Sequence, residues 1–154
     1  MADRRPVFAI NWTEVEALAQ GCHDNPHHLL GMHETVDGVY INAFMQGVKR
    51  VFAVCKNTKE RYELICDRVK DFYSVKVPDR QSFVYYFEVE QPDGTKNTII
   101  DPYAFEPVID PIDISKFNDG IHYEIYEKLG AHLCMLDGVK GVLFAVWAPH
   151  AARV

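Results

Sequence analysis

The feature that most constrains the fold is a two-residue alternation of apolar and polar side chains through the middle of the chain. It is clearest over Phe83–Glu90, where Phe83, Tyr85, Phe87 and Val89 fall on one face. Similar runs occur at 39–44, 50–55, 62–65 and 72–77, separated by turn residues at a spacing of about ten residues. Short strands at this spacing are typical of antiparallel sheets that pack face to face. The pattern therefore predicts a mainly β fold, an immunoglobulin-like antiparallel β-sandwich.

A different period precedes the strands and predicts short N-terminal helices. Trp12–Gln20 has its apolar residues at helical spacing. Thr13 is the expected N-cap of this helix, because Glu16 three residues later would complete a capping box. Asn25-Pro26 predicts a second short helical turn that runs to Leu30, because proline is favoured at the first helical position.

Residues 101–119 break the strand pattern. Pro102, Pro107 and Pro111, with the acidic residues around them, are incompatible with regular sheet pairing. This segment is therefore predicted to be an extended connector that lies across the sandwich. A short helix is expected after it, over His122–Leu129.

Composition and charge exclude several classes of protein. The chain is 48% hydrophobic, enough for a core, yet no stretch approaches the roughly 18 consecutive apolar residues of a membrane span. Its net charge of -6 argues against a nucleic-acid partner, which needs a basic face. The 154 residues are too few for a (β/α)₈ barrel, which takes about 200 or more.

The cysteines and the N-terminus indicate the compartment. Cys22, Cys55, Cys66 and Cys134 form no CxxC pair, which excludes a zinc ribbon and a thioredoxin motif. The N-terminal apolar run is too short and too interrupted for a secretory signal peptide. Reduced thiols and a cytoplasmic location are therefore expected.

An ordered set of short motifs occurs twice in the chain. The shared features are L-G-x-H, a turn D-G-V, an apolar strand and R-V, found at 30–33, 37–39, 43–44 and 50–51 and again at 129–132, 137–139, 145–147 and 153–154. Chance similarity in a strand-rich sequence is the alternative to a true repeat. If the repeat is real, the chain holds one complete sandwich and an incomplete second one at its C-terminus.

A natural protein would rarely end where the second copy stops, so we expect a fragment of a longer chain. Three parts follow from the repeat: a helical extension at 1–24, a sandwich with its connector at 25–128, and the start of a second sandwich at 129–154.

These motifs resemble those of bacterial glycogen branching enzymes. Residues 25–33, NPHHLLGMH, resemble the D-P-H-x-x-L-G-x-H motif of their extra N-terminal domain, with Asn25 in place of Asp. Asp101–Phe105 resembles their D-P-Y-x-F segment, and Tyr126–His132 resembles the junction between their modules. Residues 141–154, GVLFAVWAPHAARV, resemble the first strand of the family 48 carbohydrate-binding module. The motifs are specific in this order and cover residues 25–154.

The resemblance implies a parent enzyme of glycoside hydrolase family 13. Such an enzyme cleaves an α-1,4-glucan and transfers the released segment to a 6-hydroxyl, using a carboxylate nucleophile and a carboxylic general acid/base. In the family these groups lie in a catalytic barrel, which this chain is expected to lack. No catalytic residue, cofactor or metal is therefore assigned to the chain, and the implied partners are α-glucan (glycogen and maltooligosaccharides) and that barrel.

Three roles stay open at this point. The chain is an accessory module that positions glucan or supports the barrel, a purely structural spacer without sugar affinity, or an independent enzyme built on the cysteine and histidines of 22–33. A metal site among those histidines is not favoured, because Asn25-Pro26 marks a helix start between His23 and His27.

Trp12, Tyr40 and Tyr86 are the candidate carbohydrate-binding residues, because exposed aromatic rings can stack on sugars. Tyr40 and Tyr86 lie opposite the apolar faces of their strands. A cross-strand aromatic pair is the alternative for both. Trp147 lies on an apolar strand and is interpreted as core or inter-module packing.

The other motif residues are interpreted as structural. His27 is expected to hold backbone groups of neighbouring loops, and Gly31 to supply a turn at positive φ. Asp101 is expected to cap the turn that follows it. The full set of structural motif residues is Asn25, Pro26, His27, Leu30, Gly31, Asp101, Pro102, Tyr103, Phe105, Gly130, His132 and Trp147.

Overall fold

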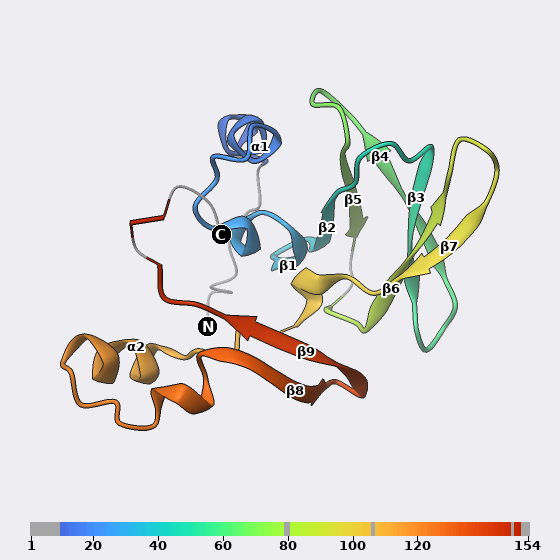
Figure 1. Ribbon diagram of the computed structural model, residues 1–154. Coiled ribbons are helices and arrows are strands. Elements are labelled where there is room, and N and C mark those ends of the chain that lie inside the picture. Colours follow the sequence, from blue (N-terminus) through green and yellow to red (C-terminus); the bar gives the residue numbers. More distant parts are fainter. Residues whose placement is uncertain (1–9, 79–80, 106, 149, 152–154) are drawn as a thin grey trace. The chain divides into compact units, whose positions relative to one another are not determined.

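The computed structural model describes residues 10–78, 81–105, 107–148 and 150–151. The described chain is mainly β and divides into two compact units, the first ending at Ala104 and the second beginning at Phe105. The first unit contains a seven-stranded antiparallel sheet and the second a two-stranded one (Figure 1). No helix among the described residues is long and apolar enough to span a lipid bilayer.

The seven strands of the first unit pair in the order β1-β2-β5-β4-β3-β6-β7. Their bounds are β1 Gly31–Thr35, β2 Gly38–Phe44, β3 Arg50–Cys55, β4 Arg61–Cys66, β5 Phe72–Pro78, β6 Tyr85–Glu90 and β7 Lys96–Ile99.

The sheet curls into two layers because β4 belongs to both. Its residues Arg61–Leu64 pair with β3, and Ile65 and Cys66 pair with β5. Strands that pass from one layer to the other form the corners of β-sandwiches. The predicted antiparallel sandwich is therefore confirmed, with its two layers joined through one strand.

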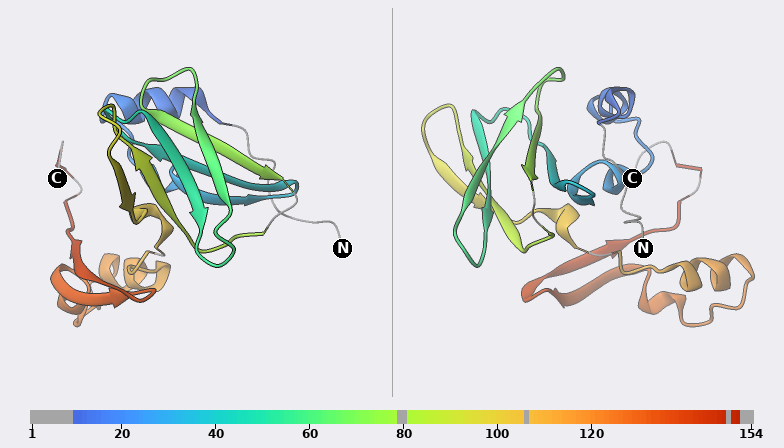
Figure 2. Two further views of the ribbon diagram at one scale, coloured as in Figure 1. Left: turned by 90° about the vertical axis from the view of Figure 1, so that its right-hand side faces the viewer. Right: turned by 180° about the vertical axis from the view of Figure 1, so that it is seen from behind.

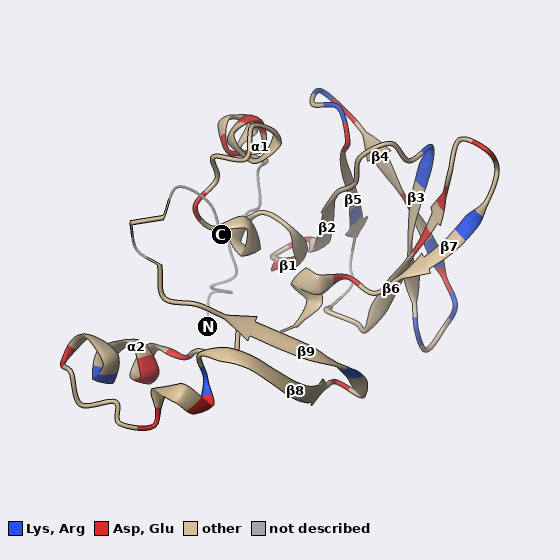
Figure 3. Cartoon of the chain, in the orientation of Figure 1, with Lys and Arg blue, Asp and Glu red and all other residues tan. Residues whose placement is uncertain are grey.

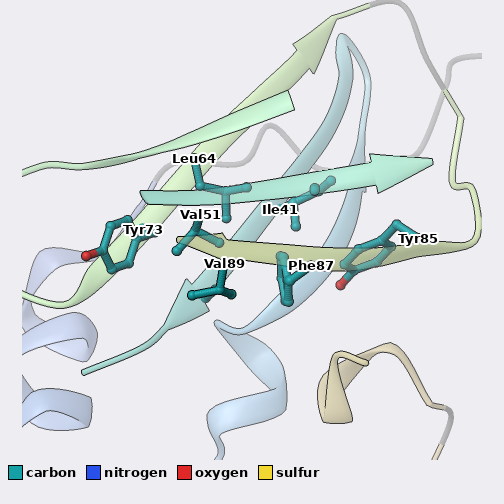
Figure 4. Close-up of a cluster of buried hydrophobic side chains, with 9 residues drawn as sticks. Ile41, Val51, Leu64, Tyr73, Tyr85, Phe87 and Val89 are labelled. Atoms are coloured by element: carbon teal, nitrogen blue, oxygen red, sulfur yellow. The ribbon is translucent and has the colours of Figure 1, made fainter. Parts of the chain in front are cut away.

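The core between the layers follows the predicted alternation. Tyr85, Phe87 and Val89 of β6 are at most 7% exposed, and Phe83 packs against the same cluster. Figure 4 shows these side chains meeting those of the other strands. The buried cluster comprises Ile41, Ala43, Val51, Ala53, Leu64, Tyr73, Tyr85, Phe87 and Val89.

A second cluster lies on the other side of the β2–β5 layer, under the helix α1 (Trp12–Ala19) and the 3₁₀ turn η1 (Pro26–His28). Val15 of α1 packs there with Leu29, Leu30 and Phe72. The layer of β2 and β5 is thus covered on both of its faces where Phe44 pairs with Phe72.

The expected N-cap of α1 is wrong. The cap is Asn11, whose side chain accepts a hydrogen bond from the Thr13 N–H at 3.2 Å. Thr13 cannot serve as cap because the helix has already begun at Trp12.

The second unit contains the helix α2 (Pro111–Asn118), the 3₁₀ turn η3 (Ile125–Glu127) and the hairpin of β8 (Gly130–Leu136) and β9 (Val139–Ala145). The prediction that 101–119 is extended is therefore wrong. Pro111 opens α2 instead of preventing it, because Asp110 and Asp113 form a capping box around the proline.

Both copies of the predicted repeat form a 3₁₀ turn, a glycine at positive φ and a hairpin. Gly31 opens β1 after η1 with φ of 91°, and Gly130 opens β8 after η3 with φ of 107°. Residues 36–37 connect the first pair of strands, so that loop begins five residues after Gly31. Residues 137–138 connect the second pair, so that loop begins seven residues after Gly130. Asp37 is the second residue of its loop and Asp137 is the first residue of its loop. The D-G-V matches are therefore offset by one residue relative to the two turns.

Candidate functional site

The two motifs that the sequence places far apart meet at Gly31. A Cβ built on Gly31 would lie 2.8 Å from the carbonyl oxygen of Tyr103, closer than real Cβ contacts. Glycine is therefore required here both for its positive φ and for the close approach of another backbone. The ring of His27 lies edge-on to the ring of Tyr103, with centroids 4.9 Å apart.

Asp101 is buried at this junction, with 3% of its surface exposed. Its carboxylate accepts hydrogen bonds from the Tyr85 hydroxyl and from the Tyr103 N–H, the latter at 2.9 Å. Burial raises the pKa of Asp101, while the bonds from Tyr85 and Tyr103 and the nearby His27 act in the opposite direction. Burial, and then the neighbouring carboxylate, raise the pKa of the Tyr85 hydroxyl. The pair ties β6 to the 3₁₀ turn η2 (Pro102–Ala104).

Asn42 of β2 also holds the turn η1 in place. The strand pattern did not identify this residue as a buried hydrogen-bonding group. Alternation placed Asn42 on the outer side of β2, yet the residue is fully buried. Its Nδ2 donates to the Leu29 carbonyl at 2.9 Å, and its Oδ1 accepts from the Ser74 hydroxyl at 2.6 Å. The sequence did hold one signal for a buried polar role of Asn42: asparagine is depleted in strands, so its presence within one is unusual.

Each L-G-x-H motif ends in a histidine that bonds back to the preceding turn. Nε2 of His33 lies 3.1 Å from the Leu30 carbonyl oxygen, and Nε2 of His132 lies 2.8 Å from that of Leu129. A carbonyl oxygen accepts only, so the ring nitrogen donates in both cases. Burial lowers the pKa of His33. His33 and His132 thus each hold a backbone group of the turn before them.

The histidines near the N-terminus converge on the carboxylate of Glu14. Its Oε2 lies 3.3 Å from His28 Nδ1 and 3.8 Å from His23 Nε2. His23 Nδ1 accepts a hydrogen bond from the Asn25 N–H, so Nε2 carries the hydrogen in the neutral ring and has no lone pair for a metal. Within the described ranges, no three His, Cys, Asp or Glu side chains are arranged to hold a metal ion.

Trp12, the first candidate stacking residue, packs against the second core cluster. Its ring meets that of Phe72 edge-on with centroids 6.1 Å apart, and the Arg68 guanidinium lies 5.2 Å from its centre. The Trp12 ring is therefore in contact with Phe72 and has the Arg68 guanidinium over one of its faces.

Tyr40 and Tyr86, the other two candidates, are half-buried and lie on opposite outer faces of the sandwich. Tyr40 belongs to the β2–β5 layer and Tyr86 to the β3–β6 layer, each pointing away from the core. A lysine ammonium lies 5.6 Å from each ring centre, that of Lys76 over Tyr40 and that of Lys59 over Tyr86. The structure therefore does not bring the three candidate rings into one site.

The second unit places its motif residues differently from the first. Within the described part of the chain, Gly130 has no close backbone neighbour, since a Cβ there would meet only Nε2 of His132, at 3.7 Å. Trp147 is 53% exposed, with its ring 4.9 Å from that of Phe117. Phe105, the first residue of this unit, is half-buried.

The apolar face of the β8–β9 hairpin carries a depression of ≈ 580 Å³ that is largely open to solvent. Its lining comprises Leu133, Cys134, Met135, Lys140, Gly141 and Val142. An open strand face of this kind differs from the enclosed pockets that bind small molecules.

Comparison with known proteins links the first unit to one family. Residues 11–103 match the family described as the N-terminal domain of the alpha-1,4-glucan branching enzyme GlgB. A 1,4-alpha-glucan branching enzyme GlgB from Thermosynechococcus vestitus is 33% identical over 146 residues. The alignment covers 92% of this chain and 19% of that relative, so the chain spans about a fifth of the relative's length.

Proposed function

The chain belongs to the family of branching-enzyme N-terminal domains, and from this premise we propose that it is the accessory N-terminal module of a 1,4-α-glucan branching enzyme. Such a parent enzyme cleaves α-1,4-glucan and transfers the segment to form α-1,6 branches, with its two carboxyl groups located outside this module. The observation that carries the proposal is the family match over residues 11–103. The module would position α-glucan chains for the parent enzyme.

The hairpin of β8 and β9 would open a second module of the carbohydrate-binding family 48 type. In the first hairpin, Met32 and Ile41 pair and pack on the core. In the second, Ala131 and Phe144 pair at the same distance from the opening glycine. The face that they share is apolar and open, with Phe144 77% and Leu133 90% exposed. Apolar strand faces are normally covered, which supports a further layer over this hairpin.

Titration of the chain with maltoheptaose, followed through its backbone amide NMR shifts, tests the glucan-binding role. We expect progressive shifts at millimolar sugar that are confined to one surface. Cellohexaose, with β-1,4 links between the same sugars, is the matched control and should leave the spectrum nearly unchanged.

A spacer without sugar affinity is the second candidate, and the Gly31 junction favours it. The polar side chains buried there, Asp101 and Asn42, have hydrogen-bond partners within the unit. Such a junction stiffens the module without a ligand. If maltoheptaose shifts no amide at millimolar concentration, the glucan-binding role is refuted and the spacer role is retained.

A further inference from the structure

We propose that the outer face of β3, β4 and β6 is the glucan-binding surface, with Tyr86 as the stacking ring and the Arg61–Glu88 pair as the group that binds sugar hydroxyls. This inference rests on the proposed glucan-binding function. It selects one of the three candidate rings and adds two charged residues that the sequence pattern did not single out.

Strand register places these groups side by side. Val54 of β3 pairs with Arg61 on one side and Tyr86 on the other. In the neighbouring row, Phe52 pairs with Glu63 and Glu88. Residues two apart in a strand share a face, so Tyr86 and Glu88 are neighbours on β6 and the two rows form one surface. Val54 is only 2% exposed, so the side chains around it leave no gap between them.

No described helix of the first unit lies over this surface. The left view of Figure 2 shows the layer of β3, β4, β6 and β7 toward the viewer, with α1 behind the sheet. Figure 3 shows Lys, Arg, Asp and Glu positions distributed along these strands. The opposite layer is different, because η1 and α1 cover the outer sides of β2 and β5 where Phe44 pairs with Phe72. An extended oligosaccharide therefore has room on the β3–β6 layer.

The chemistry of the surface suits a pyranose ring, which has an apolar C–H side and hydroxyls around its rim. An aromatic ring provides an apolar face for the first. Next to Tyr86, Arg61 Nη2 lies 2.8 Å from Glu88 Oε2, and the two side chains are 47% and 33% exposed. Each group therefore keeps hydrogen-bonding capacity toward solvent, donors on the guanidinium and acceptors on the carboxylate.

Phe52 holds this arrangement in place and does not stack on sugar itself. The guanidinium carbon of Arg61 lies 4.4 Å from its ring centre and that of Arg50 lies 4.7 Å away. Arg50 in turn makes a bidentate pair with Glu63, at 2.7 and 2.9 Å. Because Arg61 is held by both the ring of Phe52 and the carboxylate of Glu88, its planar donor group is oriented before a ligand arrives.

The test is the same maltoheptaose titration, run on single variants of the chain. Wild-type shifts should map to β3, β4 and β6. Tyr86→Ala should weaken binding about tenfold or more, and Glu88→Gln should weaken it several-fold, since one charge-assisted acceptor is lost. Tyr40→Ala is the matched control, another outward tyrosine beside a lysine, and should change the dissociation constant less than about twofold.

The outcomes separate this inference from the proposed function. Shifts that map elsewhere, or binding that Tyr86→Ala and Glu88→Gln both leave intact, would overturn the inference and leave glucan binding standing. An absence of all shifts in the wild type would overturn glucan binding itself. Glu88→Gln, a conservative change at the surface, keeps the test decisive if Tyr86→Ala does not fold.

Discussion

Gly31→Ala tests the claim that the first unit is held together by the close approach of two backbones at the motif junction. The added Cβ would lie 2.8 Å from the Tyr103 carbonyl oxygen, at a φ of 91°. The strained φ alone costs about 1–2 kcal/mol for a residue with a Cβ. Displacing the Tyr103 backbone adds about 1–3 kcal/mol, the usual cost of overpacking. The expected loss of stability is therefore roughly 2–5 kcal/mol.

Gly94→Ala is the matched control within the same unit. Gly94 has nearly the same φ, 87°, but a Cβ there would meet no atom of the described residues within 4 Å. Its expected cost is the backbone strain alone, about 1–2 kcal/mol. The difference between the two variants isolates the contact with Tyr103.

Native-state hydrogen exchange of the β3 and β6 amides measures the free energy of unfolding of this unit without interference from the second. Gly31→Ala should lower that free energy by at least about 1 kcal/mol more than Gly94→Ala does. Equal losses in the two variants would refute the reasoning, because they would mean that the Tyr103 segment moves aside at no cost.

Two further predictions concern buried polar groups. Hydrogen bonding to His122 is the main cause that lowers the pKa of Asp113 from 3.8 to about 2, so the ionised carboxylate stabilises the second unit above about pH 4 and this contribution is lost as the pH falls toward 2. The protection of the β8 amides, measured as their exchange relative to the intrinsic rate at each pH, should therefore fall over that range, and Asp113→Asn should flatten this fall. Asn42→Ala should lower the stability of the first unit by about 1–3 kcal/mol in urea unfolding, because the buried Leu29 carbonyl loses its donor. Ser74→Ala, which leaves that bond intact, should cost about 1 kcal/mol or less.

The strands were predictable because their signal is local. Phe83–Glu90 alternates in the sequence, and the buried side chains of β6 are those that the alternation selects. The repeat was also readable, since both copies fold into a turn, a glycine and a hairpin. The cap of the first helix was misjudged because Asn11 and Thr13 are both good caps, and the choice depends on where the helix begins.

The prediction of an extended connector over 101–119 is wrong because proline has two effects on secondary structure. A proline prevents sheet pairing, but it also begins a helix when an acidic cap precedes it. Asp110 and Asp113 surround Pro111 in that way, and a helix results where an extended segment was expected.

The sequence by itself determined the strands, their buried faces, the turns and the family to which the chain belongs. Only the tertiary structure decided which polar residues are buried and which face is open. Asn42 and Tyr40 have the same place in the alternation, yet the turn η1 covers Asn42 and not Tyr40. The Gly31–Tyr103 approach, the Tyr85–Asp101 bond and the row of Arg61, Val54 and Tyr86 likewise join residues from different strands and turns. Local periodicity fixes the direction of a side chain, whereas its partner depends on which distant segments the curled sheet brings together.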